Sequence, residues 1–285
     1  MLIIVGFIVV FGSVVGGFVL EGGAIMALWQ PIELLIIGGA GLGSLLVMAP
    51  MHTIKSIISQ ILGTLSSGYS KKDFTNLMCM LYEIFNIARR EGLVGLESHI
   101  ENPTESEVIK AYPVFLKNHH AVDFMADTMR LIITGSVQPH ELEALLDSDL
   151  EIHHEEINHA PHILNTVSDS FPGLGIVAAV LGIVITMSVI SGPPEIIGHK
   201  VGAALVGTFL GILLCYGFVG PLARNMLDRN EADGLYMVCL KQCLLAFCKG
   251  FPPSIAVEYG RRCLSNDVRP SFTGLEEACK DTRKT

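Results

Sequence analysis

Residues 171–223 read FPGLGIVAAVLGIVITMSVISGPPEIIGHKVGAALVGTFLGILLCYGFVGPLA, and this stretch decides the fold. Its two runs 171–192 and 201–223 contain no Asp, Glu, Lys or Arg, and only the short connection 193–200 separates them. At a rise of about 1.5 Å per residue, a helix of that length crosses the hydrocarbon core of a bilayer. The stretch therefore predicts a transmembrane hairpin, called hairpin 2 below.

The same pattern occurs near the N-terminus, where the uncharged runs 2–20 and 34–51 predict a first transmembrane hairpin. Across all 285 residues, 50% are hydrophobic and only 16% are charged, whereas soluble domains average about 25% charged residues. No long alternating run favours a strand. We therefore expect an all-α integral membrane protein with four transmembrane helices, a large helical cytoplasmic insert and a helical cytoplasmic tail.

The positive charges predict the orientation. Of 19 Lys and Arg residues, none lies in 21–33 and one lies in 193–200, while eight lie in 52–170 and ten follow residue 223. Because cytoplasmic connections carry the excess of Lys and Arg, we expect both termini on the cytoplasmic side of the plasma membrane. The expected divisions are hairpin 1 (1–51), insert (52–170), hairpin 2 (171–223) and tail (224–285). A net charge of −9 argues against nucleic acid as a partner.

Helix signals recur in the insert. Ser70 with Asp73 predicts a capping box, and Thr104 with Glu107 predicts a second one. Pro139 is expected to open a third helix. The predicted apolar stripes are Leu77, Leu81, Ile84, Phe85 and Ala88 in the first helix, and Leu142, Leu145, Leu146 and Leu150 in the third.

Signatures of an enzyme are weak. His154 and His159 are five positions apart, about 140° around a helix, so they do not reproduce the HExxH pattern of zinc proteases. Neither a phosphate-binding GxxxxGK[ST] loop nor a GxSxG elbow occurs. We expect a protein without catalytic residues, metal site or cofactor, and keep a membrane metalloprotease as an alternative.

Small residues four positions apart recur in the predicted spans and favour close helix packing in an oligomer. The pairs are Gly12/Gly16, Gly39/Gly43, Gly175/Ala179, Ala178/Gly182 and Gly207/Gly211. Pro172 and Pro221 lie at the expected cytoplasmic edges of hairpin 2, where they fit either bending points or ordinary helix boundaries. The four uncharged runs hold no carboxylate that could carry a proton. Either the chain conducts no ion, or a partner supplies the titrating group.

Several stretches resemble the MotA stator subunits of flagellar motors, within the MotA/TolQ/ExbB proton-channel superfamily, and cover almost the whole chain in order. They are MLIIVGFIVVFGSVVGGFVLEGGAIMALWQPIELLIIGGAGLGS, ARREGLVGLESHIENP, PGLGIVAAVLGIV, VGTFLGILLCYGFVGPLA, and IAVEYGRR followed by RPSF. The resemblance implies a subunit that, with MotB, couples inward proton flow to torque on the rotor. It also implies a ring of five such chains around MotB, whose aspartate binds the proton, and a contact with the rotor protein FliG.

The resemblance also assigns roles to residues of this chain. Pro172, Pro221 and Thr208 match family positions along the ion path, and Ala179 stands where sodium-type stators have a threonine, which favours protons. Arg89 and Glu97 match the charged pair that contacts the rotor, although Arg90 offers a second arginine for that contact. The alternatives are a non-conducting membrane scaffold and a TolQ/ExbB-like energy transducer.

Overall fold

The computed structural model describes residues 2–66 and 68–281. Helices make up all the regular secondary structure in this described part. The chain divides into two compact units, 1–66 with 156–229 and 67–155 with 230–285. The predicted insert is thus shared between the units, because its two ends, 52–66 and 156–170, belong with the apolar helices.

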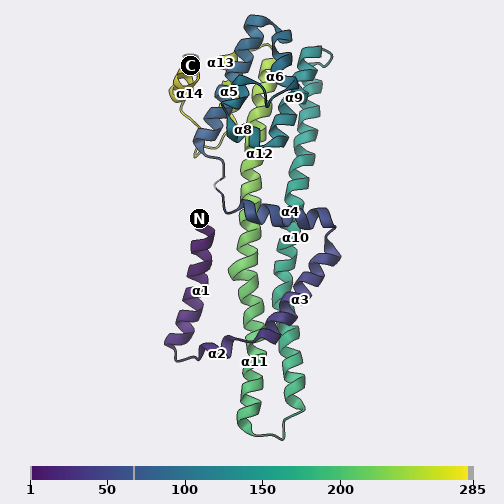
Figure 1. The fold of residues 1–285 in the computed structure, drawn as a ribbon, viewed down its shortest axis with the longest axis vertical. Helices are drawn as coiled ribbons and strands as arrows, with labels where there is room; N and C mark the ends of the chain where they lie inside the picture. Colours follow the sequence, from purple (N-terminus) through teal and green to yellow (C-terminus); the bar gives the residue numbers. More distant parts are fainter. Residues whose placement is uncertain (1, 67, 282–285) are drawn as a thin grey trace. The chain divides into compact units, whose positions relative to one another are not determined.

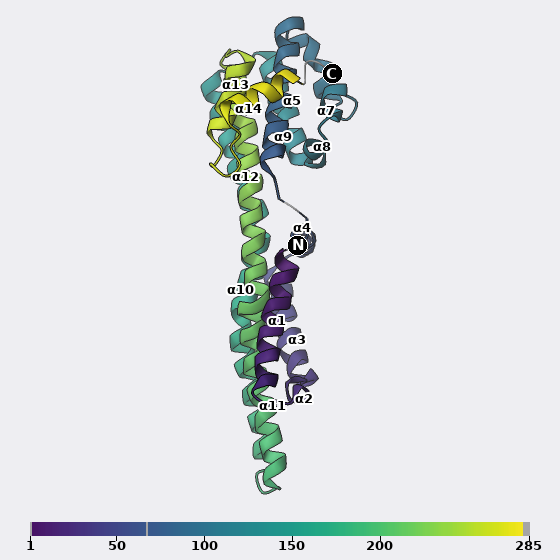
Figure 2. The ribbon, with the colours of Figure 1, turned by 90° about the vertical axis from the view of Figure 1, so that its left-hand side faces the viewer.

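The first unit contains α1 (Leu2–Leu20), α2 (Ile25–Leu28), α3 (Pro31–Met48) and α4 (Met51–Gly63). It also contains the C-terminal part of α10 (Pro139–Met187), α11 (Pro194–Leu213), the π-helix η2 (Leu214–Val219) and the start of α12 (Gly220–Cys248). Figure 1 shows α10 and α11 side by side, joined by a short turn. In Figure 2, α1 and α3 lie on the same side of this hairpin.

Within the described residues, four helical stretches are long and apolar enough to cross a membrane: Leu2–Leu20, Ile25–Met48, Pro139–Met187 and Pro194–Cys248. Their bounds differ from the uncharged runs. The helix of the second run begins at Pro31 and ends at Met48, α10 ends at Met187 rather than at residue 192, and α11 begins at Pro194 rather than at residue 201. Proline accounts for both early starts, because its fixed φ and missing N–H suit the first position of a helix.

The second unit is built around α5 (Lys71–Glu91), which is followed by Gly92 with a positive φ of 79°. Around it lie η1 (Leu93–Leu96), α6 (Glu97–Glu101), α7 (Glu107–Lys110), α8 (Pro113–Lys117), α9 (His119–Thr134), α13 (Pro253–Arg262) and α14 (Phe272–Asp281). Parts of α10 and α12 complete the unit. Stacked rings link α5 and its N-terminal approach to α12, with centroids 4.4 Å apart for Phe85 and Phe247 and 4.3 Å for Tyr69 and Tyr236.

The predicted capping box of α5 is confirmed, since the backbone N–H of Ser70 donates to an Asp73 carboxylate oxygen at 2.7 Å. All five predicted stripe residues of α5 are buried. The second capping box is wrong. There the N-cap is Ser106, whose hydroxyl accepts from the backbone N–H of Ile109 at 3.3 Å.

Pro139 opens α10 as predicted. In the stripe that follows, Leu142 and Leu146 are buried, but Leu145 is half exposed. A stripe of four leucines is wider than the face that this helix buries.

Candidate functional site

In the first unit α10 and α11 approach each other closely, and glycine makes this possible. A Cβ atom on Gly175 would lie 2.8 Å from the carbonyl oxygen of Gly207, and one on Gly211 would collide with the carbonyl of Phe171. Neither position has room for a side chain, so the two backbones are in direct contact. Gly175, Gly207 and Gly211 are among the predicted small-residue positions. Gly12, Gly16, Gly39 and Gly43, by contrast, have open space around them.

Two of the predicted ion-path residues lie at this contact. Ala179 is buried, and a Cβ on Gly207 would lie 3.4 Å from its backbone nitrogen. Thr208 is half-buried, and a Cβ on Gly175 would lie 3.3 Å from its Cα. Ala179 and Thr208 therefore come from facing helices and reach the same glycine-lined contact.

Neither predicted proline marks a helix end. Pro172 is half-buried inside α10, which runs without interruption from Pro139 to Met187. Pro221 follows the π-helix η2, within a stretch that is helical from Pro194 to Cys248. An interior proline removes one backbone hydrogen bond and bends a helix. The interpretation of both prolines as ordinary helix boundaries is wrong.

The π-helix before Pro221 is held by a hydrogen bond from α10. The hydroxyl of Ser168 donates to the backbone carbonyl of Cys215 at 3.2 Å, and both residues are buried. A π-helical turn shifts the backbone register and leaves carbonyls without their usual partner. Ser168 therefore ties the irregular turn on one side of the hairpin to the helix that contains Pro172.

Sequence reasoning missed Glu33, which it placed in an outer connection. The structure puts Glu33 in the first turn of α3, with its side chain 7% exposed. One carboxylate oxygen, Oε2, is buried and makes no hydrogen bond. The expectation that the spans of this chain contain no carboxylate is therefore wrong. Pro31, as the first residue of a helix, was the signal that could have revealed it.

The predicted rotor-contact residues lie in the second unit. Arg89 and Arg90 occupy the last turn of α5, and Glu97 opens α6. All three side chains are exposed, and none forms an ion pair with the part of the chain that the structure describes. The opposite charges complement the helix dipoles, with cations at a C-terminus and an anion at an N-terminus. This arrangement leaves them available to an external partner.

The histidines considered as metal ligands, His154 and His159, are both exposed on α10. Among the described residues, no three His, Cys, Asp or Glu side chains gather as a metal site would require. Nearby, His153 lies 3.4 Å from an Asp233 carboxylate oxygen and stacks on His120 at 3.6 Å between ring centroids. Burial and the neighbouring His153 lower the pKa of His120. These contacts serve the packing of the second unit.

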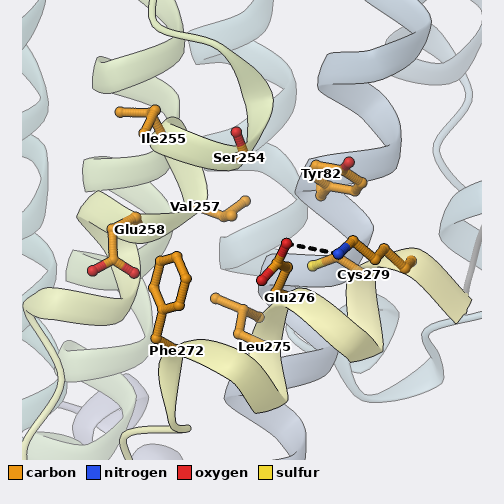
Figure 3. A pocket seen from close by; sticks show the side chains of 10 residues that line it. Tyr82, Ser254, Ile255, Val257, Glu258, Phe272, Leu275, Glu276 and Cys279 are labelled. Atoms are coloured by element: carbon orange, nitrogen blue, oxygen red, sulfur yellow. Dashed lines mark hydrogen bonds and ion pairs between the residues drawn. The ribbon is translucent and has the colours of Figure 1, made fainter.

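A pocket of about 230 Å³ lies among α5, α13 and α14 (Figure 3). Its lining is mostly apolar and includes Tyr82, Val257, Phe272 and Leu275. The dashed line in Figure 3 is the ion pair between Glu276 and Lys280, 2.7 Å long. Glu258 is held by Arg261 and Arg262, so neither carboxylate is free for acid–base chemistry.

Comparison with known proteins connects both units to one family. The description "Motility protein A N-terminal" matches residues 4–92, and "MotA/TolQ/ExbB proton channel family" matches residues 117–233. Motility protein A of Salmonella typhimurium is 42% identical over 284 residues, covering 99% of this chain and 96% of its own length. Motility protein A of Bacillus subtilis is 25% identical over 282 residues, covering 99% and 97%.

Solved structures share the fold. The MotAB structure of C. jejuni aligns with a TM-score of 0.77 and 19% identity, covering 94% of this chain and 98% of that one. The flagellar MotAB stator complex of Bacillus subtilis aligns with a TM-score of 0.72 and 21% identity, covering 90% and 92%. The chain is a multi-pass inner-membrane protein, and its full-length match over both hairpins places it in the motility protein A family, the MotA stator subunits of the bacterial flagellar motor.

Proposed function

We propose that this chain surrounds MotB as a ring of five and couples inward proton flow to torque on FliG. The relatives and fold neighbours named above support MotB as the partner. The observation that carries the proposal is the glycine-lined contact of α10 with α11, beside which Ala179 and Thr208 lie. A backbone contact without intervening side chains can change register or angle at low steric cost.

In this proposal the aspartate of MotB takes up a proton and loses its charge. The uncharged acid prefers a different position against α10 and α11, and the ring turns by one step. One proton that crosses a potential of 100 mV releases about 2.3 kcal/mol, roughly four times thermal energy. Pro172 and Pro221 would localise the bending of the two helices, because each removes a backbone hydrogen bond.

The movement would reach the rotor through the expected insert (52–170), with Arg89 and Glu97 as the contact with FliG. Both side chains are exposed and unpaired within the described residues. Exposed charges of opposite sign suit rapid, steered association rather than permanent binding. The charge distribution between the loops supports cytoplasmic termini.

The decisive experiment replaces Pro172 or Thr208 with leucine and measures assembly and rotation separately. We expect complexes that still co-purify with MotB but drive no rotation of tethered cells. Val184→Leu, at an exposed position of α10, is the matched control and should leave rotation intact. If the leucine variants impair only assembly, the chain is a scaffold and the coupling proposal fails.

The coupling ion has its own test. At Ala179 the side chain offers only a methyl group, and a methyl group cannot replace part of the water shell of sodium. Swimming speed should therefore follow the proton gradient when proton and sodium gradients are varied separately. A speed that follows sodium alone would overturn this part of the proposal.

A further inference from the structure

Glu33 lies on the packed face of α3, not on its exposed side. The buried residues of this helix are Glu33, Ile37 and Gly41, which are four positions apart and so form one line along it. A Cβ on Gly41 would lie 2.6 Å from the Phe171 ring of α10, and α3 also packs along α11. Figure 1 shows α3 beside both helices of the hairpin. The carboxylate is therefore enclosed by three helices.

The space that holds the carboxylate exists because two facing residues lack side chains. A Cβ on Gly207 would lie 3.1 Å from Oε2 of Glu33, and one on Gly182 would lie 3.7 Å from Oε1 and 2.9 Å from the Cβ of Ala204. The same Gly207 adjoins Ala179. Glu33 is therefore next to the predicted ion path, on the side that faces α3.

The site is deep within the hairpin. Ala204 and Gly207 are ten and thirteen residues after Pro194, the first residue of α11, which corresponds to about 15 to 20 Å along the helix. Although Glu33 is near the start of its own helix, it is therefore far from the outer end of α11. This depth distinguishes it from Glu195, which is exposed in the first turn of α11.

No described cation neutralises Glu33. The ionisable residues of α11 are Glu195, His199 and Lys200. Lys200 lies one turn outward from Ala204 and forms no ion pair with Glu33. No ionisable residue occurs in α1, in α2 or in residues 171–187, the hairpin part of α10. An ionised carboxylate without a partner in such surroundings costs several kcal/mol. The acid form, which carries its own proton, avoids that cost.

We propose that Glu33 is a proton-binding site within the membrane part of this chain, protonated while α3 is packed on α10 and α11 and deprotonated when that contact opens. On release, the O–H bond of the acid breaks, its electron pair stays on the carboxylate, and the proton passes to water. Lys200 lies one turn away from Ala204 and can then pair with the carboxylate. Binding of the next proton reverses each change.

The site deepens the proposed function and rests on it for the direction of proton flow, but it is distinct from the aspartate of MotB. It adds one titratable group for every copy of this chain. Protonation of Glu33 and packing of α3 are linked. Each bound proton would therefore shift the equilibrium toward the state in which α3 is packed on the hairpin.

The test is infrared difference spectroscopy of the purified complex with MotB, which detects the C=O stretch of protonated carboxylic acids. We expect a band that is lost in Glu33→Gln, retained in Glu195→Gln, and retained when the MotB aspartate is changed to asparagine. The band should disappear reversibly as the pH is raised. A band that is unchanged in Glu33→Gln, or that never titrates, overturns the proposal.

If Glu33→Gln does not assemble, the proposal is tested with Glu33→Asp, which keeps the carboxylic acid and shortens the side chain by one methylene. In the assembled Asp variant the band should shift in frequency, and a band at its original frequency would assign it to another residue. The two proposals fail separately. A complex with the band but without proton-driven rotation disproves the function alone, whereas a rotating complex without the band disproves this site alone.

Discussion

The hydroxyl of Ser168 in α10 donates a buried hydrogen bond of 3.2 Å to the backbone carbonyl of Cys215 in the π-helix η2. This bond joins the two helices of the hairpin at the irregular turn that precedes Pro221. In Ser168→Ala, the carbonyl loses one of its two donors and keeps the backbone N–H of Gly220, so the expected cost is that of one hydrogen bond, about 0.5 to 1.5 kcal/mol. We expect a lower melting temperature of the purified complex and slower rotation.

Ser170→Ala is the matched control, since the Ser170 hydroxyl bonds only to Val167 in its own helix, at 2.6 Å. Its melting temperature should stay close to that of the unmodified complex. Equal losses in both variants would mean that the bond between the helices has no special effect.

The second prediction concerns Gly211. In Gly211→Ala the new methyl group would collide with the Phe171 carbonyl and lie 3.0 Å from the Cα of Gly175. Because backbone atoms cannot move aside as a flexible side chain can, α10 and α11 must separate, and overpacking of this kind costs about 1 to 3 kcal/mol. The yield of assembled complex, measured by size-exclusion chromatography, should fall several-fold.

Gly202→Ala is the control on the same helix, because nothing lies within 4 Å of its added Cβ. Alanine is also the better helix former. Assembly of this variant should equal or exceed that of the unmodified chain. If Gly211→Ala assembles equally well, the direct backbone contact is not required.

Composition predicted the membrane character of this fold because uncharged runs of some twenty residues have few other uses in a protein. The ends of the helices were harder to predict from the sequence. A search for uncharged runs stops at Glu33, although Pro31 has already opened the helix and Glu33, Ile37 and Gly41 form one buried line. Whether a carboxylate is tolerated there depends on the missing side chains of Gly182 and Gly207, which are distant in sequence.

The candidate site was likewise predictable in part. Spacing of small residues indicated the approach of α10 and α11 at Gly175, Gly207 and Gly211, but the same spacing at Gly12 and Gly16 corresponds to open space. A pattern of small residues permits a contact without specifying the partner helix. The continuity of the helices through Pro172 and Pro221 could not be predicted either, because proline alone is equally compatible with an end or a bend.

Charge reversal tests the rotor contact. Arg89→Glu and Glu97→Lys each place the unfavourable charge at a helix end, which costs only about 0.3 to 1 kcal/mol, so both variants should fold and assemble. We nevertheless expect swimming in soft agar to fall at least several-fold, because the charge offered to the rotor is reversed. Arg90→Glu shows which of the two arginines carries the contact.

Lys117→Glu serves as the comparison, since Lys117, like Arg89, is exposed and lies in the last turn of its helix. It should swim normally. A compensating charge reversal on FliG should restore motility to Arg89→Glu if the two surfaces meet, and failure of every such compensation would contradict the proposed contact.

The last prediction concerns the pH dependence of the second unit. Hydrogen bonds from Arg261, at 2.6 and 2.8 Å, and from Arg262, at 2.7 Å, hold the pKa of Glu258 below its ordinary value. Because the pKa is lower in the folded state, the stabilisation is complete above the pKa of the unfolded chain, about 4.3, and is lost as the pH falls through the folded value. Glu258→Gln should therefore melt at a lower temperature than the unmodified chain at pH 7, and the difference should vanish in acid. Hydrogen bonds to charged groups of this kind contribute about 1.5 to 3 kcal/mol.

Glu276→Gln removes an exposed ion pair from the same pocket and should leave the melting curve unchanged at every pH. A deficit of Glu258→Gln that persists below both pKa values would show that shape, and not charge, gives this residue its effect.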